Sequence, residues 1–220
     1  MRRTRIKVCC IRSVVEAEAA IAAGVDAVGL VGPMPTGPGV VDDETARTIG
    51  AMVPPPVMPW LLSSEETADG IAAHAERCGA PTVQIVRHVA PEVHEALAAR
   101  APWLRRVQVI HVEGPEALDT VAAYGTRPHA FLLDSGRLSA AELGGTGRRH
   151  DWRISRQIVE AAARPVFLAG GLSPENAAEA VAAVRPFGLD VCSGLRRDDW
   201  LVPGRLAAFV AAVRTADAAA

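Results

Sequence analysis

The sequence predicts a (β/α)8 barrel, an α/β fold formed by one domain that spans residues 1–220. Eight short apolar segments alternate with eight longer segments in which apolar residues recur at helical spacing. Glycine-bearing turns follow the last two apolar segments, as is common in such barrels. The alternative is an open doubly wound sheet. That fold often has a G-x-G-x-x-G turn after its first strand, and no such turn follows Cys10.

The predicted strands are short runs of mainly aliphatic residues, as expected for strands that are buried on both faces. They cover residues 6–10, 27–31, 57–62, 82–86, 107–112, 130–133, 166–169 and 189–192. Several of the intervening helices begin with a proline behind a loop. In "SPEN", Ser173 can cap a helix whose first position is Pro174. The predicted helices cover residues 14–23, 43–52, 65–78, 91–101, 115–124, 152–163, 174–184 and 203–215.

Composition excludes several classes of protein. The formal net charge is -2, so the chain lacks the basic surface that nucleic-acid binding requires. No apolar run approaches the roughly 20 residues of a membrane helix. The basic start "MRRTRIKV" leads into a strand without the apolar core of a signal peptide. We therefore expect a cytoplasmic enzyme, monomeric or homodimeric, with no nucleic-acid or membrane partner.

The cysteines and histidines do not have the spacing of a metal site. No C-x-x-C, H-x-x-x-H or H-E-x-x-H motif occurs. The neighbouring Cys9 and Cys10 would point to opposite faces of a strand, so they cannot chelate one ion together. We expect no metal and no cofactor, and we interpret Cys10, Cys78 and Cys192 as packing residues.

Two side chains at strand ends are candidates for acid–base chemistry. Cys9 ends the first strand and would share the inner face with Lys7, the only lysine in the chain. A small buried cysteine is more often a packing residue. Asp134 in "FLLDSG" ends an apolar strand, where a carboxylate is costly unless it is paired, caps a turn or has a function. The presence of both groups at one barrel mouth favours a catalytic pair.

Several of these segments resemble those of one family. "KVCCIRSVVEAEAAIAAGVDAVGLV", "FLLDS", "GGTGRRHDW", "FLAGGLSPEN" and "RPFGLDVCSGL" are similar to the motifs of phosphoribosylanthranilate isomerase, in the same order and at the same spacing. The resemblance covers most of the chain and is most specific in its glycine-rich segments. It implies a (β/α)8 barrel that carries out an Amadori rearrangement in tryptophan biosynthesis, on a small phosphosugar substrate and without a cofactor.

The resemblance also implies roles for individual residues. Cys9 matches the general base of the family and Asp134 its general acid. Lys7 is close enough along the strand to favour the thiolate. Backbone groups would hold the substrate phosphate at Gly145, Gly170, Gly171, Ser193 and Gly194.

The sequence departs from the family pattern at the other end of the substrate. The family usually has an arginine after the second strand that meets the anthranilate carboxylate. Here the segment is "MPTGPGVV", with Pro38 or Gly39 at that place. Arg87 or His111 could replace it. Two alternatives follow from this departure: a paralogue that isomerises another phosphosugar, and a barrel that binds a phosphorylated ligand without catalysis.

Overall fold

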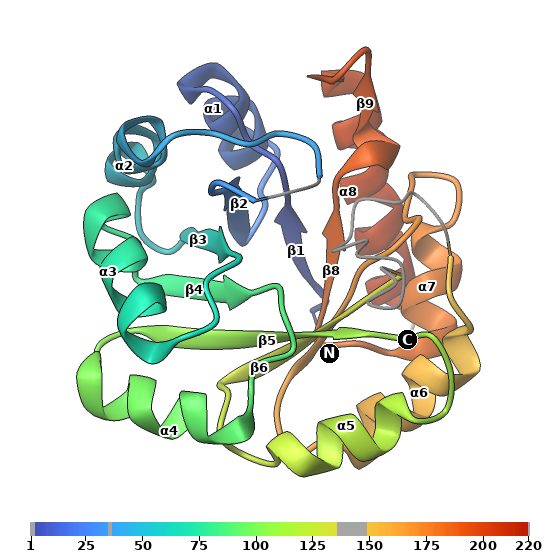
Figure 1. Cartoon of the computed structure of the whole chain (residues 1–220). Helices are drawn as coiled ribbons and strands as arrows, with labels where there is room; N and C mark the ends of the chain where they lie inside the picture. The colour runs from blue at the N-terminus through green and yellow to red at the C-terminus, as the bar shows by residue number, and fades with distance from the viewer. Residues whose placement is uncertain (1–2, 35–36, 136–148, 220) are drawn as a thin grey trace.

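Eight parallel strands close into a barrel, and helices form a ring outside it (Figure 1). The computed structural model describes residues 3–34, 37–135 and 149–219. Strand order follows the chain, and pairing of β1 with β8 closes the barrel. The strands are β1 (Arg5–Val8), β2 (Ala27–Val31), β3 (Met58–Ser63), β4 (Thr82–Ile85), β5 (Arg105–His111), β6 (Ala130–Asp134), β7 (Val166–Leu168) and β8 (Gly188–Val191). The predicted (β/α)8 barrel is confirmed.

One helix follows each strand. These are α1 (Val14–Ala22), α2 (Asp43–Met52), α3 (Ala68–Cys78), α4 (Pro91–Arg100), α5 (Ala117–Tyr124), α6 (Trp152–Ala161), α7 (Ala177–Val184) and α8 (Pro203–Ala219). A short 3-10 turn, η2 (Ser193–Leu195), and a two-stranded ribbon of β9 (Arg196–Arg197) and β10 (Trp200–Leu201) separate β8 from α8. Among the described residues, none of the helices has both the length and the apolar character of a membrane span.

Most element boundaries differ from the predicted ones by a few residues, and local contacts explain the larger differences. The helix α3 begins at Ala68 because the Thr67 side chain accepts a hydrogen bond from the backbone of Gly70 and caps it. The helix α7 begins at Ala177, because the segment before it forms a turn in which the Asn176 side chain binds backbone groups of Gly171 and Ser173.

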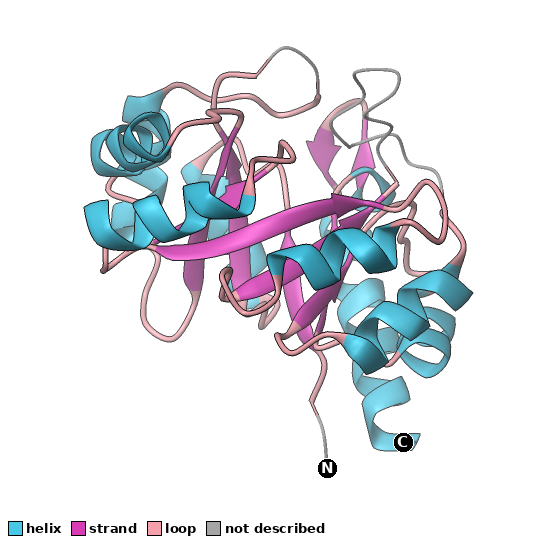
Figure 2. Ribbon diagram, turned by 60° about the horizontal axis from the view of Figure 1, so that its bottom comes forward, coloured by secondary structure: helices cyan, strands magenta, loops and turns pink. Residues whose placement is uncertain are grey.

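The C-terminal helix is longer than predicted and is joined to the start of the barrel. The buried carboxylate of Asp217 accepts hydrogen bonds from the backbone N–H of Thr4, at 3.0 Å to each oxygen. Arg214 forms an ion pair with the same carboxylate at 3.1 Å. These contacts hold both ends of the described chain at the same end of the barrel (Figure 2).

Alternation along each strand separates two apolar layers. One set of side chains packs between the sheet and the helices, and its members include Ile6, Val8 and Leu189. The other set fills the barrel interior, with Trp60, Leu132 and Phe167 among its largest members. Polar side chains of the inward-facing rows therefore lie in the barrel interior or at its mouth, where the carboxyl ends of the strands meet.

Candidate active site

A buried ion pair lies inside the barrel beside its closing seam. Lys7 on β1 is fully buried, and its Nζ lies 2.9 Å from Oδ2 of Asp190 on β8. The two residues are register partners, so both side chains point inward. The Lys7 ammonium also lies 5.4 Å from the ring centroid of Trp60. Burial acts to lower the pKa of Lys7, but the charges of Asp190 and then Cys9 raise it above its ordinary value. Lys7 is therefore a fixed positive charge.

Cys9 lies directly after β1 and shares the inward face with Lys7. A hydrogen bond from the thiol of Cys10 is the main cause that lowers the pKa of Cys9, and the charge of Lys7 adds to it against the effect of burial. Gly29 on β2 lies beside Cys9 and Lys7, and their side chains occupy the space that a side chain at position 29 would fill. A Cβ atom at Gly29 would lie 2.9 Å from both the Cys9 Sγ and the Lys7 Nζ. The absence of a side chain there lets the thiol and the ammonium approach one another.

Asp134 ends β6 and faces the same mouth. Burial raises its pKa to about 6, partly opposed by a hydrogen bond of 2.7 Å from the backbone N–H of Ser135 to its Oδ1. The charge of Asp190 raises the pKa further, and that of Lys7 lowers it. The thiol of Cys9 and the carboxyl of Asp134 thus have pKa values shifted in opposite directions, toward one another. Both shifts bring the pKa values nearer to neutral pH, as expected of two groups that transfer protons.

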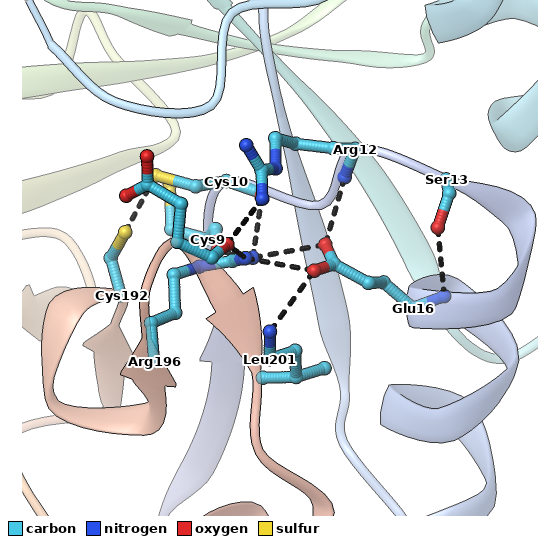
Figure 3. Close-up of polar contacts among 9 residues, drawn as sticks. Cys9, Cys10, Arg12, Ser13, Glu16, Cys192, Arg196 and Leu201 are labelled. Carbon is cyan, nitrogen blue, oxygen red and sulfur yellow. Dashed lines mark hydrogen bonds and ion pairs between the residues drawn. The ribbon is translucent and has the colours of Figure 1, made fainter.

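A network of hydrogen bonds supports the segment around Cys9 from outside the barrel interior (Figure 3). Arg196 on β9 donates to the backbone oxygens of Cys9 and Cys10 and forms an ion pair of 2.8 Å with Glu16 on α1. Both charged side chains of this pair are buried. The pair connects the loop after β1 to the ribbon after β8 and limits the movement of the thiol-bearing loop.

The turns after β7 and β8 are in close contact, as the glycine-rich segments suggested. Gly170 and Gly171 have φ angles of 83° and 64°, in the left-handed region that favours glycine. A Cβ atom at Gly194 would overlap the carbonyl oxygen of Leu172, so the two turns approach as closely as backbones allow. Ser193 is exposed in the same turn. Of the residues expected to bind phosphate, Gly145 lies outside the described residues.

The two candidates for the carboxylate contact lie in different surroundings. His111 ends β5 as the register partner of Asp134, so it lies beside that carboxyl on the inward face. Its ring is buried and lies 5.3 Å from the ring of His88. Arg87 follows β4, is partly exposed, and forms an ion pair of 3.1 Å with Glu66.

Sequence reasoning missed two features of this site. Asp190 in "GLDV" is a carboxylate within an apolar strand, which is the same signal that identified Asp134. The contact of the Cys10 and Cys192 thiols, 2.6 Å between the sulfur atoms, had no signal in the spacing of the cysteines. We expected these two cysteines to be packing residues, and Cys10 to point to the face of the strand opposite to that of Cys9. Cys10 is buried, and its thiol contacts those of Cys192 and Cys9.

One group of side chains away from the mouth has the composition of a metal site. Donor atoms of Asp43, His74 and Cys78, on α2 and α3, lie within 4.8 Å of one another. The Asp43 carboxylate already binds Arg77 at 2.6 Å and lies 3.3 Å from His74, and Cys78 donates to it at 3.6 Å. These contacts explain the group as a polar contact between two helices.

Comparison with known proteins agrees with this geometry. The family model described as N-(5'-phosphoribosyl)anthranilate (PRA) isomerase matches residues 6–199. The chain belongs to this family. N-(5'-phosphoribosyl)anthranilate isomerase 2 of Methanosarcina mazei is 36% identical over 193 residues, which are 87% of this chain and 85% of that protein. The Haloferax volcanii isomerase is 36% identical over 217 residues, or 97% and 94% of the two chains. The solved phosphoribosyl anthranilate isomerase of Thermus thermophilus has a TM-score of 0.81 at 27% identity, covering 96% of this chain and 99% of its own.

Adding one methyl group at Gly29 should impair turnover without unfolding the barrel. In Gly29→Ala the new Cβ displaces the ends of two flexible side chains, Cys9 and Lys7. A shift of a catalytic atom by a fraction of an ångström to one ångström lowers turnover by about 10- to 100-fold. Gly50→Ala is the matched control, because a Cβ there meets nothing within 4 Å. It should keep its turnover and gain about 0.5–1 kcal/mol in the free energy of unfolding. Equal turnover of both variants would contradict this interpretation of Gly29.

The raised pKa of Asp134 should be visible in stability. A carboxyl whose pKa rises from 3.8 to about 6 on folding makes the native state bind more protons than the unfolded state between these values. The contribution of Asp134 to the free energy of unfolding therefore falls as pH rises from about 4 to about 6. The free energy of unfolding of Asp134→Asn should therefore rise relative to that of the parent across this window, by up to about 3 kcal/mol. Denaturant unfolding at pH 4, 5, 6 and 8 measures the difference. The exposed Asp119→Asn is the control, and a pH-independent difference for Asp134→Asn would count against the raised pKa.

Proposed function

We propose that this chain catalyses the Amadori rearrangement of N-(5′-phosphoribosyl)anthranilate, with Asp134 as general acid and Cys9 as general base. One observation supports these roles above all others. A thiol with lowered pKa and a carboxyl with pKa raised to about 6 face the same barrel mouth. The family to which the chain belongs supports the substrate.

The chemistry follows from the protonation states of the two groups. Protonated Asp134 donates its proton to the ring oxygen of the ribose as the bond from C1 to that oxygen breaks. The nitrogen lone pair forms the C1–N double bond of an iminium ion. The Cys9 thiolate then removes the proton from C2, and the electron pair left behind forms an enolamine. The hydroxyl on C2 of the enolamine then loses its proton as C1 gains one, which gives the aminoketose. Two protons are added, at the ring oxygen and at C1, and two are removed, so no redox partner is needed.

We further propose that Lys7 maintains the thiolate and that the turns after β7 and β8 hold the phosphate. The ammonium of Lys7 is one of the causes that lower the pKa of Cys9. Backbone N–H groups near Gly170, Gly171, Ser193 and Gly194 suit an anion, because glycine lets the ligand approach the backbone. Gly145, outside the described residues, completes this proposed set. The substrate is a small phosphosugar, and we infer a cytoplasmic monomer or homodimer without nucleic-acid or membrane partners, in keeping with the charge of -2.

The proposed roles predict large losses of turnover on substitution. Cys9→Ala and Asp134→Asn should each lower kcat for N-(5′-phosphoribosyl)anthranilate by about 10²–10⁴-fold, because each removes one proton transfer. Cys78→Ser changes a cysteine outside the mouth and is the matched control. Steady-state kinetics and rescue of a tryptophan auxotroph that lacks this isomerase measure the effect. Failure of the parent chain to rescue while the protein is present in solution would contradict the proposed substrate and favour a paralogue.

The carboxylate of the substrate requires a cationic or hydrogen-bonding partner, for which we propose Arg87 or His111. Substituting the residue that binds it should raise KM by about 10- to 100-fold at nearly unchanged kcat. We would compare Arg87→Gln with His111→Gln, and use Glu66→Gln, which removes the ion-pair partner of Arg87, as the control.

The segment that lacks the usual arginine offers a gain-of-function test of the same contact. Pro38→Arg should lower KM. Gly39→Arg is unsuitable, because Gly39 has a φ of 75° and its Cβ would lie 2.6 Å from the Cβ of Cys10. Unchanged KM values in Arg87→Gln, His111→Gln and Pro38→Arg would mean that another group binds the carboxylate.

A further inference from the structure

Two thiols that transfer no proton in the proposed reaction meet at the barrel mouth. The sulfur atoms of Cys10 and Cys192 lie 2.6 Å apart (Figure 3). The residues are 182 positions apart in sequence and follow β1 and β8, the two strands that close the barrel. Cys10 is buried and Cys192 is partly exposed, so one member of the pair is accessible from solvent.

The backbone of Cys10 has an unfavourable conformation for a residue with a side chain. Its φ angle is 63°, in the left-handed region that residues with a Cβ rarely adopt. Such a conformation costs roughly 1 kcal/mol for a residue other than glycine. Contacts on both sides maintain it. The Arg196 guanidinium binds the Cys10 carbonyl oxygen, and Gly39 leaves room for the Cys10 Cβ. Strain of this kind is concentrated at functional positions.

We propose that Cys10 and Cys192 are a redox-active dithiol that closes to a disulfide by exchange with a low-molecular-weight disulfide. A sulfur–sulfur bond is about 2.05 Å long, so the atoms need to approach by only a few tenths of an ångström. The two loops already lie side by side, since the backbone N–H of Cys9 binds the carbonyl oxygen of Val191 at 2.9 Å. Closure therefore requires no rearrangement of the barrel.

The exchange can proceed in two balanced steps. The partly exposed Cys192, as thiolate, attacks one sulfur of the small disulfide and releases one equivalent of the small thiol. The Cys10 sulfur then attacks the mixed disulfide at Cys192, loses its proton and releases the second equivalent. Two cysteines are oxidised and one small disulfide is reduced.

Formation of the disulfide should raise the pKa of the neighbouring Cys9. The effect of this change on turnover rests on the proposed role of Cys9 as the base. The hydrogen bonds with Cys192 and Cys9, with burial, raise the pKa of Cys10 well above its ordinary value, so it remains a protonated donor. That donor is the main cause of the lowered pKa of Cys9. A disulfide consumes the Cys10 proton and removes the hydrogen bond. The pKa of Cys9 then rises, and less of it is thiolate at neutral pH.

A chemical test of the dithiol does not depend on turnover. The parent chain would be equilibrated with oxidised glutathione, denatured in a thiol-blocking reagent, and analysed by intact mass and peptide mapping. We expect two of the four cysteines to be lost as free thiols, a link between residues 10 and 192, and full recovery with dithiothreitol. Cys78→Ser should form the same link, and Cys192→Ser should form none. Glutathione attached without an internal link, or a link that includes Cys9, would overturn the proposal.

A kinetic test addresses the coupling to Cys9. The oxidised parent should turn over about 10-fold more slowly than the reduced parent at neutral pH, which corresponds to a rise of one unit in the pKa of the base. The rise of kcat/KM with pH should move to higher pH by the same amount. Cys192→Ser, treated with the same reagent, should show equal rates before and after treatment. A disulfide that forms without changing the pH profile would overturn this coupling. Failure of the proposed substrate would leave the thiol analysis intact.

Discussion

The ion pair of Lys7 and Asp190 is the interaction on which the rest of the site depends. Neither charge is exposed to bulk solvent, because Lys7 is fully buried and Asp190 nearly so. A buried charge without its partner costs several kcal/mol, so each residue requires the other. The pair also joins the first and last strands at the place where the barrel closes. Its position therefore connects closure of the barrel to the positive charge beside Cys9.

The pair explains how one small interior can hold a thiol of lowered pKa and a carboxyl of raised pKa. Lys7 favours the thiolate of Cys9 and also favours the ionised form of Asp134, whereas Asp190 has the opposite effect on both. Their effects partly cancel at each group. Other causes then decide the protonation states: a hydrogen-bond donor at Cys9, and burial at Asp134. The ion pair thus supplies a nearly neutral environment in which local contacts can shift the two pKa values in opposite directions.

The barrel was predictable from the sequence, because strands that are buried on both faces are runs of mainly aliphatic residues. Eight such runs alternate with helical segments along the chain. Cys9 and Asp134 were predictable as strand-end residues, although their roles are still proposals. The pairing of Lys7 with Asp190 was not predicted, because it joins strands at opposite ends of the chain and depends on barrel register. The contact of Cys10 with Cys192 depends on a left-handed residue that no periodicity shows.

The thiols are better suited than the ion pair to alter the pKa of Cys9 in response to an external reagent. Breaking the ion pair would leave a charge buried inside the barrel, so its two members remain charged whenever the fold is intact. The thiols are neutral donors, and exchanging their hydrogen bonds for a covalent bond leaves no unpaired charge. Cys192 is partly exposed, whereas Lys7 and Asp190 are enclosed. The interior therefore combines a permanent electrostatic element with a hydrogen-bond chain, from Cys192 through Cys10 to Cys9, that chemistry at the mouth can alter.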